Sequence, residues 1–517
     1  MEKLNIEETR GIQVLVFLSI LTISFIIILS IDNSIWLDEA ATILESNRNL
    51  AEIISFLKKD GLGPPLYYFL LSLWMRVFGI SEFAVKSLSI IFYMLSLFAV
   101  YFSGKSIYDK KTGLLCLFLY MVSPLSIVHA LNVRMYSLLG LVGIMSTLFF
   151  LKLFLLKVDS RKDFLLYILV NVFGTFTHYW FMFVILSQIV CYILLFSGSL
   201  FKKFIAATVI SLMPFFLLWL PILFSQMDNG STFWLEKPNI IVALKDTILN
   251  FFGGGIQPGG NSIALIVYAT FLFLIIFQFE GIRVKFQKFF VLKKYITEDR
   301  NISFLIFLFV SLLVPLIISQ VKPLYFIGRY TIIALFPFVM FVGSLISRFG
   351  NKFLILFCCY TMIVGLTTKV AINEYSTIRF SDKLTTEYLV KHAGDNDILI
   401  FTSLSRAPID YYLRLLKPSK PFIKISFPSE ISSHLGWRDI DKMLSQKDIL
   451  HKEATTILSR ILNEHITNRN KIWLFYGSDT NISNILKNKL DLHFFISEEK
   501  DLQGSFYNKI LLYKKVN

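Results

Sequence analysis

Eleven apolar runs, each about the length of a membrane-spanning helix, constrain the fold of this chain more than any other feature. A hydrocarbon core about 30 Å thick needs about 20 apolar residues per helix. Hydrophobic residues make up 55% of the 517 residues and charged residues only 17%, whereas soluble proteins carry about 25% charged residues. The composition therefore excludes a water-soluble enzyme, a disordered chain and a fibre, and it predicts an all-α polytopic membrane protein. The runs cover Gly11–Ile31, 82–104, 113–130, 136–156, 164–178, 180–199, 204–224, 261–280, 302–320, 326–346 and 353–371.

The placement of Lys and Arg predicts the direction of the spans. Short cytoplasmic loops collect basic residues. The five basic loops fall on one side, together with the N-terminus, if the 14-residue run Pro65–Phe78 lies along the outer surface instead of crossing. We therefore expect a plasma-membrane protein with a cytoplasmic N-terminus and a first outer loop over 32–81 that carries a juxtamembrane helix. The net charge of +15 is then mainly a topology signal, and no nucleic-acid partner is expected. The basic loops lie at 105–111, 157–162, 202–203, 283–300 and 348–352.

Residues 372–517 follow a different pattern. Short β-like runs at 397–401, 471–476 and 509–513 alternate with helical stretches such as 382–392 and 440–463. This alternation is typical of a small α/β domain. We expect two domains, a transmembrane catalytic domain over 1–371 and a soluble extracytoplasmic domain over 372–517. The four cysteines lie in apolar runs without metal-ligand spacing and predict neither a disulfide framework nor a zinc site.

The predicted topology gathers unusual polar and aromatic residues at the outer ends of the spans. Asp38 and Glu39 directly follow the first span, where a carboxylate can take a proton from an incoming hydroxyl. Cations at this depth can hold a departing phosphate, and aromatic rings can line a sugar or prenyl groove. Any one of these residues could instead be an acidic residue of a solvated loop, an aromatic residue at the membrane interface or a basic residue that reaches lipid headgroups. The prediction of a site therefore depends on their placement together on one side. The candidate cations are Lys86, Arg134, Lys322 and Arg329, and the candidate ring residues are Tyr67, Tyr136, His178, Tyr179 and Tyr330.

The order of motifs resembles that of the GT-C membrane glycosyltransferases, in particular bacterial relatives of protein mannosyltransferases and aminoarabinose transferases. The resemblance is dense over 36–185 and continues thinly through Lys322-Pro323, Arg329-Tyr330 and Pro337. It implies the GT-C fold, a polyprenyl-phosphate-linked sugar as donor, and a lipid, glycan or protein as acceptor. The quoted motifs are WLDEA, PPLYYFLLSLWMRVFGISEFAVKSLS, KSIYDKKTGLL, SPLSIVHALNVRMYSLLGL and THYWFMF.

The resemblance also implies roles for single residues. Asp38 would act as general base in an inverting single displacement, and Glu39 would orient the acceptor or hold a neighbouring cation. Lys86 stands where the family usually has Arg, and it loses the bidentate fork of a guanidinium. Val133 stands where relatives often have an acidic residue. The sequence indicates no particular cofactor, because it contains no cluster of metal-ligating residues and the family includes metal-independent members. Binding of a divalent cation remains an alternative.

Two other functions remain as alternatives to a glycosyltransferase of cell-envelope glycan assembly. A transporter or flippase of lipid-linked sugars should show inverted repeats or broken helices near the membrane midplane, and the sequence shows neither. A non-catalytic assembly subunit would have a degenerate site, whereas this chain keeps Asp38 and Glu39.

Overall fold

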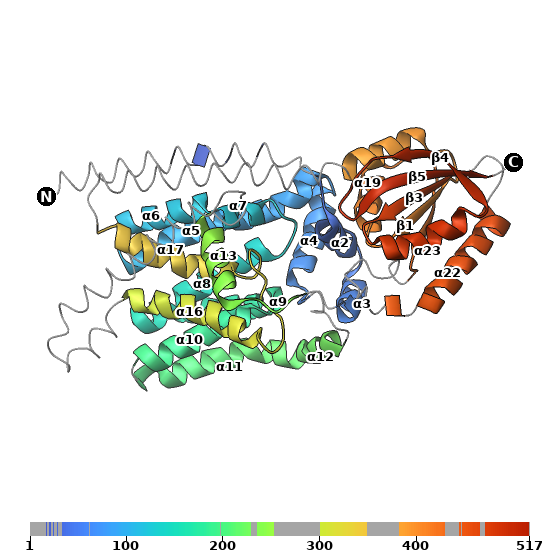
Figure 1. The fold of residues 1–517 in the computed structure, drawn as a ribbon. Helices are drawn as coiled ribbons and strands as arrows, with labels where there is room; N and C mark the ends of the chain where they lie inside the picture. Colours follow the sequence, from blue (N-terminus) through green and yellow to red (C-terminus); the bar gives the residue numbers. More distant parts are fainter. Residues whose placement is uncertain are drawn as a thin grey trace.

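The computed structural model describes residues 34–60, 63–196, 198–228, 235–252, 300–348, 382–429, 444–445, 447–465 and 471–515, with five positions of the first predicted span (17, 20, 21, 24 and 28). Within these residues, a helical bundle leads into a C-terminal domain built on one sheet (Figure 1). The predicted spans 261–280 and 353–371, most of Gly11–Ile31, and the predicted domain boundary at 371/372 lie outside the described residues.

Most of the predicted runs within the described residues form helices, whereas residues 326–331 of the predicted run 326–346 are not helical. Its elements are α2 (Leu37–Ser46), α3 (Leu50–Asp60), α4 (Leu66–Phe78), α5 (Glu82–Ile107), α6 (Lys110–Val122), α7 (Pro124–Ala130), α8 (Tyr136–Phe150) with the π-turn η1 (Leu151–Leu155), α9 (Arg161–Thr177), α10 (Phe181–Leu195), the 3-10 turn η2 (Gly198–Leu200), α11 (Phe201–Leu218), α12 (Leu220–Asp228), α13 (Ile240–Phe252), α16 (Arg300–Ile318) and α17 (Ile332–Ile346).

Several of these helices can cross a membrane. Among the described residues, four are long and apolar enough, namely Glu82–Ile107, Tyr136–Leu155, Phe201–Leu218 and Arg300–Ile318. A fifth candidate is the pair α6 and α7, which meet at a 62° bend. The sequence predicts one straight span there, but Pro124 starts α7 and leaves Ser123 in an extended conformation, because a residue before proline disfavours the helical region. The chain is therefore a multi-pass membrane protein, and the count of eleven spans stays a prediction.

Helix α4 has the length and pattern expected of a juxtamembrane helix. Its 13 residues extend only about 20 Å, which is too short for a hydrocarbon core. Tyr67, Tyr68 and Leu71 are buried, whereas Leu73 and Val77 on the other face are exposed.

Glycines allow α5 and α6 to pack closely against each other. Gly104 of α5 faces Gly113 of α6, and a Cβ atom at Gly104 would lie 2.6 Å from the Gly113 Cα. Such contacts let two backbones approach within a membrane domain.

The C-terminal domain is a three-layer α/β structure. Its strands are β1 (Ile398–Thr402), β2 (Ile423–Phe427), β3 (Ile472–Gly477), β4 (Phe494–Lys500) and β5 (Tyr507–Lys515). The sheet order is β2-β1-β3-β5-β4, in which β1 is parallel to β2 and β3, and β5 is antiparallel to β3 and β4.

Helices cover both faces of this sheet. The helical segment 382–392 and α19 (Arg406–Leu416) supply Leu389, Ile409 and Leu413 to one buried layer. On the opposite face lie α22 (Lys447–Arg460), which ends in the π-turn η3 (Ile461–His465), and α23 (Thr480–Leu490) (Figure 1).

Candidate active site

Asp38 lies in the first turn of α2, next to an arginine that is far from it in the sequence. Its Oδ2 accepts a hydrogen bond from Arg329 Nη1 at 2.8 Å, and 291 residues separate the two. The side chains of Asp38 and Arg329 are only 8% and 20% exposed. The Arg329 guanidinium also lies 5.0 Å from the ring centre of Trp36 and 4.7 Å from that of Phe326. Ion pairing and cation–π contacts therefore fix this charge pair together.

Glu39 supports the backbone around Asp38. Its Oε2 accepts from the Trp36 N–H at 3.2 Å and its Oε1 from the Val133 N–H at 2.9 Å. The first bond satisfies an N–H at the start of α2, as in a capping box. The second ties α2 to the turn before α8. Glu39 is fully buried, and its predicted role toward the acceptor stays a prediction.

Arg134 reaches α2 from that same turn. Its Nη1 donates to Thr42 Oγ1 at 2.8 Å and lies 3.4 Å from the Asp38 carbonyl oxygen. The residue is 8% exposed, and its buried Nε has no hydrogen-bond acceptor among the described residues. Arg134 therefore brings a positive charge and an unused donor beside the Asp38–Arg329 pair.

Aromatic rings from the turn between α9 and α10, from the start of α8 and from the turn before α17 lie close to one another beside the charged residues. Tyr330 follows Arg329 directly, and its ring centre lies 4.8 Å from that of His178, 5.2 Å from Trp180 and 6.2 Å from Tyr136. The Trp180 N–H donates to His178 Nδ1 at 3.1 Å, which places a ring proton of neutral His178 on Nε2. These rings form one wall of the site.

Two of the other predicted site residues, Tyr179 and Tyr67, form hydrogen bonds with residues outside this cluster. Tyr179 accepts from Trp219 Nε1 at 2.9 Å and donates to Gln226, so it packs against α11 and α12. The Tyr67 hydroxyl lies 3.0 Å from Ser89 Oγ, and burial raises the pKa of Tyr67 well above its usual range. Lys86 is buried near the start of α5, and Lys322 is exposed in the connection between α16 and α17.

The site also contains residues that the sequence reasoning missed. Trp36 and Phe326 hold Arg329, and His129 packs 4.8 Å from Tyr136. Trp36 and His129 belong to motifs named above, and Phe326 lies three residues before Arg329. Their nearness in sequence to the predicted site residues could have indicated them, but their neighbours in the sequence are mostly apolar.

Both carboxylates of the cluster have hydrogen-bond partners in this structure. Arg329 binds Asp38, and backbone amides occupy both oxygens of Glu39. In the part of the chain that the structure describes, no three His, Cys, Asp or Glu side chains gather closely enough to hold a metal ion.

The C-terminal domain contacts the segment that leads into Asp38. The Tyr412 hydroxyl of α19 accepts from the Ile35 N–H at 2.7 Å and donates to Glu82 Oε1 at 2.6 Å. Burial and the charge of Glu82 raise the pKa of Tyr412 well above its usual range, so it stays a neutral phenol. Lys383 adds an ion pair to Glu82 Oε2 at 2.8 Å.

Comparison with known proteins identifies the fold. A family model described as dolichyl-phosphate-mannose-protein mannosyltransferase matches residues 63–222. The crystal structure of ArnT from Cupriavidus metallidurans in the apo state is similar over 97% of this chain and 98% of its own, with a TM-score of 0.62 and 10% identity. The chain has the GT-C fold. This confirms the resemblance seen in the sequence.

Two further structures share the GT-C fold. ArnT from Cupriavidus metallidurans bound to undecaprenyl phosphate matches with a TM-score of 0.62 and 11% identity, over 97% of this chain and 98% of its own. The apo oligosaccharyltransferase from Archaeoglobus fulgidus matches with a TM-score of 0.51 and 10% identity, over 98% of this chain and 74% of its own. No curated protein matches the chain in sequence. At these identities the structural likeness concerns the fold alone.

Proposed function

We propose that this chain is a membrane glycosyltransferase, which moves a hexose or pentose from a polyprenyl-phosphate donor to an acceptor hydroxyl on the outer face of the plasma membrane. One observation carries the proposal. Asp38 is held by Arg329, beside the unused donor of Arg134 and a wall of aromatic rings. A base, a cation for the leaving phosphate and a ring-lined wall are the parts that such a transfer requires.

Each group has a role in a single displacement. Asp38 takes the proton of the acceptor hydroxyl as the hydroxyl oxygen attacks the anomeric carbon. The bond from that carbon to the phosphate oxygen breaks on the opposite side, so the anomeric centre inverts and polyprenyl phosphate leaves. Arg134 donates to the departing phosphate, because its Nε is buried without an acceptor among the described residues. Arg329 holds the Asp38 carboxylate in position.

The comparisons support the donor class. The ArnT structure with bound undecaprenyl phosphate shares this fold, and the family model that matches residues 63–222 describes enzymes that use dolichyl-phosphate-mannose. We propose a cell-envelope lipid, glycan or protein as acceptor.

The contacts at the two ends of α5 support the proposed topology. The C-terminal domain contacts Glu82 at its start, and Arg300, from a predicted cytoplasmic loop, donates to the Ile107 carbonyl at its end. The 26 residues of α5 extend about 39 Å, enough to separate two membrane faces. Single cysteines at the exposed positions Asn47 and Lys417 should react with an impermeant maleimide in intact cells, and one at Lys110 only after permeabilisation. Reaction of the Lys110→Cys variant with the maleimide in intact cells would show that the proposed topology is wrong.

The substitution Asp38→Asn tests the chemistry. Purified wild type and variant are incubated with radiolabelled polyprenyl-phosphate sugars and a membrane extract from the host. We expect wild type to release free polyprenyl phosphate and Asp38→Asn to be at least about 100-fold slower, since a general base contributes about 10²- to 10⁴-fold. Asp109→Asn is the matched control, because Asp109 caps α6 by accepting from the Thr112 N–H and Asn caps equally well.

Both variants must elute as folded protein and bind donor for the comparison to hold. Turnover by Asp38→Asn at the wild-type rate would remove Asp38 from the role of base. If wild type also fails with every donor, a flipping assay in liposomes tests the transporter alternative.

A further inference from the structure

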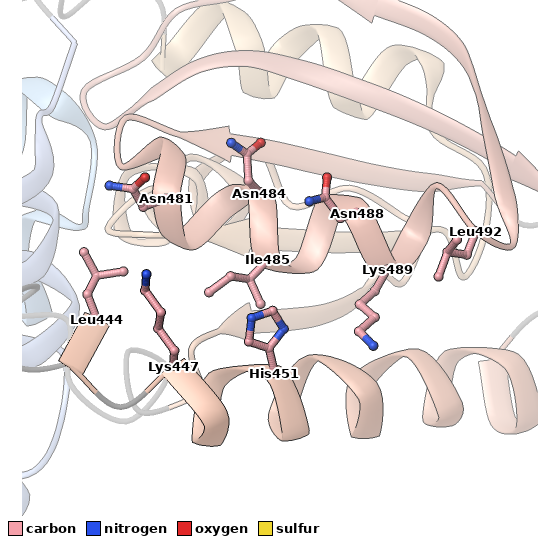
Figure 2. A pocket seen from close by; sticks show the side chains of 9 residues that line it. All are labelled: Leu444, Lys447, His451, Asn481, Asn484, Ile485, Asn488, Lys489 and Leu492. Atoms are coloured by element: carbon pink, nitrogen blue, oxygen red, sulfur yellow. The ribbon is translucent and has the colours of Figure 1, made fainter.

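A second candidate binding site lies in the C-terminal domain, apart from Asp38. It is a groove of about 560 Å³ between α22 and α23. Figure 2 shows that Lys447 and His451 point from α22 toward α23, and that Ile485 and Lys489 point from α23 back toward α22. We call it the α22–α23 groove. Its polar lining consists of Lys447, His451, Asn481, Asn484, Asn488 and Lys489.

The side chains of the groove combine amides with positive charge. Asn481 and Asn488 lie two turns apart on α23, about 10 Å along the helix, and each amide offers both donors and acceptors. Repeated amides of this kind suit the hydroxyls of successive sugar rings. Asn484 is partly engaged already, because its Oδ1 accepts from the Tyr476 hydroxyl at 2.7 Å.

The charge of the groove favours an anion. Lys447 and Lys489 come from opposite walls, and no Asp or Glu is among the described lining residues. Neither lysine forms an ion pair with a described residue, whereas Lys487 on another side of α23 is paired with Asp491 at 2.7 Å. A phosphate or carboxylate between the walls would meet two ammonium groups with no competing carboxylate beside them.

The direction of the groove suits an extended ligand. In Figure 2 Leu444 lies at the end of the groove nearer to the ribbon of the helical part, and the other labelled lining residues follow from there along α22 and α23. Leu444 and Ile485 supply apolar surface in the lining, on which the less polar faces of sugar rings can pack.

We propose that the α22–α23 groove binds an anionic glycan, whose hydroxyls contact the Asn amides and whose phosphate or carboxylate groups pair with Lys447 and Lys489. This inference rests on the proposed function, and it narrows the acceptor proposed there, a lipid, glycan or protein, to an anionic glycan. The groove then holds the polymer while one end reaches the active site.

A binding measurement on the full-length protein tests this proposal. The protein is placed in nanodiscs of zwitterionic lipid, and a fluorescent phosphodiester-linked hexose trimer is titrated at low salt. We expect wild type to bind this trimer and to bind the matching uncharged trisaccharide at least tenfold more weakly. The double variant Lys447→Gln/Lys489→Gln should bind the charged trimer about 10- to 100-fold more weakly, the range expected for loss of charge-assisted hydrogen bonds.

Two further variants make the result specific. Lys487→Gln removes the same charge from the same helix outside the groove and should stay within twofold of wild type. Asn488→Ala should weaken binding severalfold without changing net charge. Equal binding by wild type and the double variant would overturn the proposal. It would also fail if inorganic phosphate, or vesicles of anionic lipid, bound as tightly as the trimer and displaced it completely.

The assay contains no donor, so its outcome is independent of sugar transfer. If the double variant binds the trimer as tightly as wild type while sugar transfer remains active and dependent on Asp38, only this inference is overturned. Specific binding in the groove of a protein that transfers no sugar overturns the proposed function alone.

Discussion

The Tyr412 hydroxyl connects the C-terminal domain to the segment that leads into Asp38, so Tyr412→Phe should loosen that segment. The substitution removes one oxygen and keeps the ring, which is fully buried. The Ile35 N–H, also buried, loses its acceptor at 2.7 Å, and Glu82 Oε1 loses a donor at 2.6 Å. Glu82 keeps the ion pair with Lys383, so the larger loss falls on Ile35.

A buried N–H without a partner costs about 1–3 kcal/mol. If local opening exposes this amide, its hydrogen exchange should accelerate roughly 5- to 150-fold, since 1.4 kcal/mol corresponds to a factor of ten. Hydrogen exchange with mass spectrometry, on peptides that cover 34–46, measures this directly in detergent. Asp38 should become less well placed, so transfer should slow while donor binding is retained.

Tyr513→Phe is the matched control for Tyr412→Phe. The Tyr513 hydroxyl also donates to a carboxylate, Asp491 Oδ1 at 2.8 Å, but it does so inside the C-terminal domain. We expect no change of exchange over 34–46 in this variant. The reasoning is refuted if Tyr412→Phe leaves exchange over 34–46 as slow as in wild type, or if Tyr513→Phe accelerates it equally.

Two further predictions concern stability. Gly104→Ala should lower the thermal stability in detergent by about 1–3 kcal/mol, the usual cost of overpacking, because its Cβ would lie 2.6 Å from Gly113 Cα; Gly143→Ala, with open space around its Cβ, should not. Burial raises the pKa of Asp382 to about 6, although hydrogen bonds from Ser505 act in the opposite direction and lower it. An unfolded Asp titrates near its ordinary value, so the unfolded chain loses this proton first as pH rises. The C-terminal domain should therefore lose on the order of 3 kcal/mol between about pH 4 and pH 6. Unfolding followed against pH should show this loss in wild type and not in Asp382→Asn, and equal profiles would refute it.

The sequence predicted the helices well because their apolar runs are long. It also predicted β1, β3 and β5, the three central strands of the sheet. It missed β2 and β4, the two edge strands. In β4 only Phe494 is buried, so its residues show little of the apolar pattern that marks a central strand.

The sequence placed candidate site residues on one membrane face but predicted no contacts between them. Topology alone placed Asp38, Arg134 and Arg329 at one face, and the structure brings all three together. It did not distinguish His178 from Tyr179. These neighbours occupy one turn between α9 and α10, yet His178 joins the Tyr330 rings and Tyr179 turns toward Trp219. Which way a side chain points depends on helix rotation and packing, and residue type and span order do not encode either.

The energetics of the Asp38–Arg329 pair favour a role in chemistry over a role in stability. Removing two charges from water costs several kcal/mol per ion, and a buried pair is often no more stabilising than apolar residues of similar volume. This bundle offers many apolar contacts, so it did not need a charged pair to fold. The pair instead holds a carboxylate in one orientation between aromatic rings and beside Arg134. A preorganised base in a site that excludes most water is what proton abstraction from a hydroxyl requires. The same reasoning explains why Asp38→Asn must be compared on folded, donor-binding protein, because loss of one partner leaves the Arg329 charge only partly compensated.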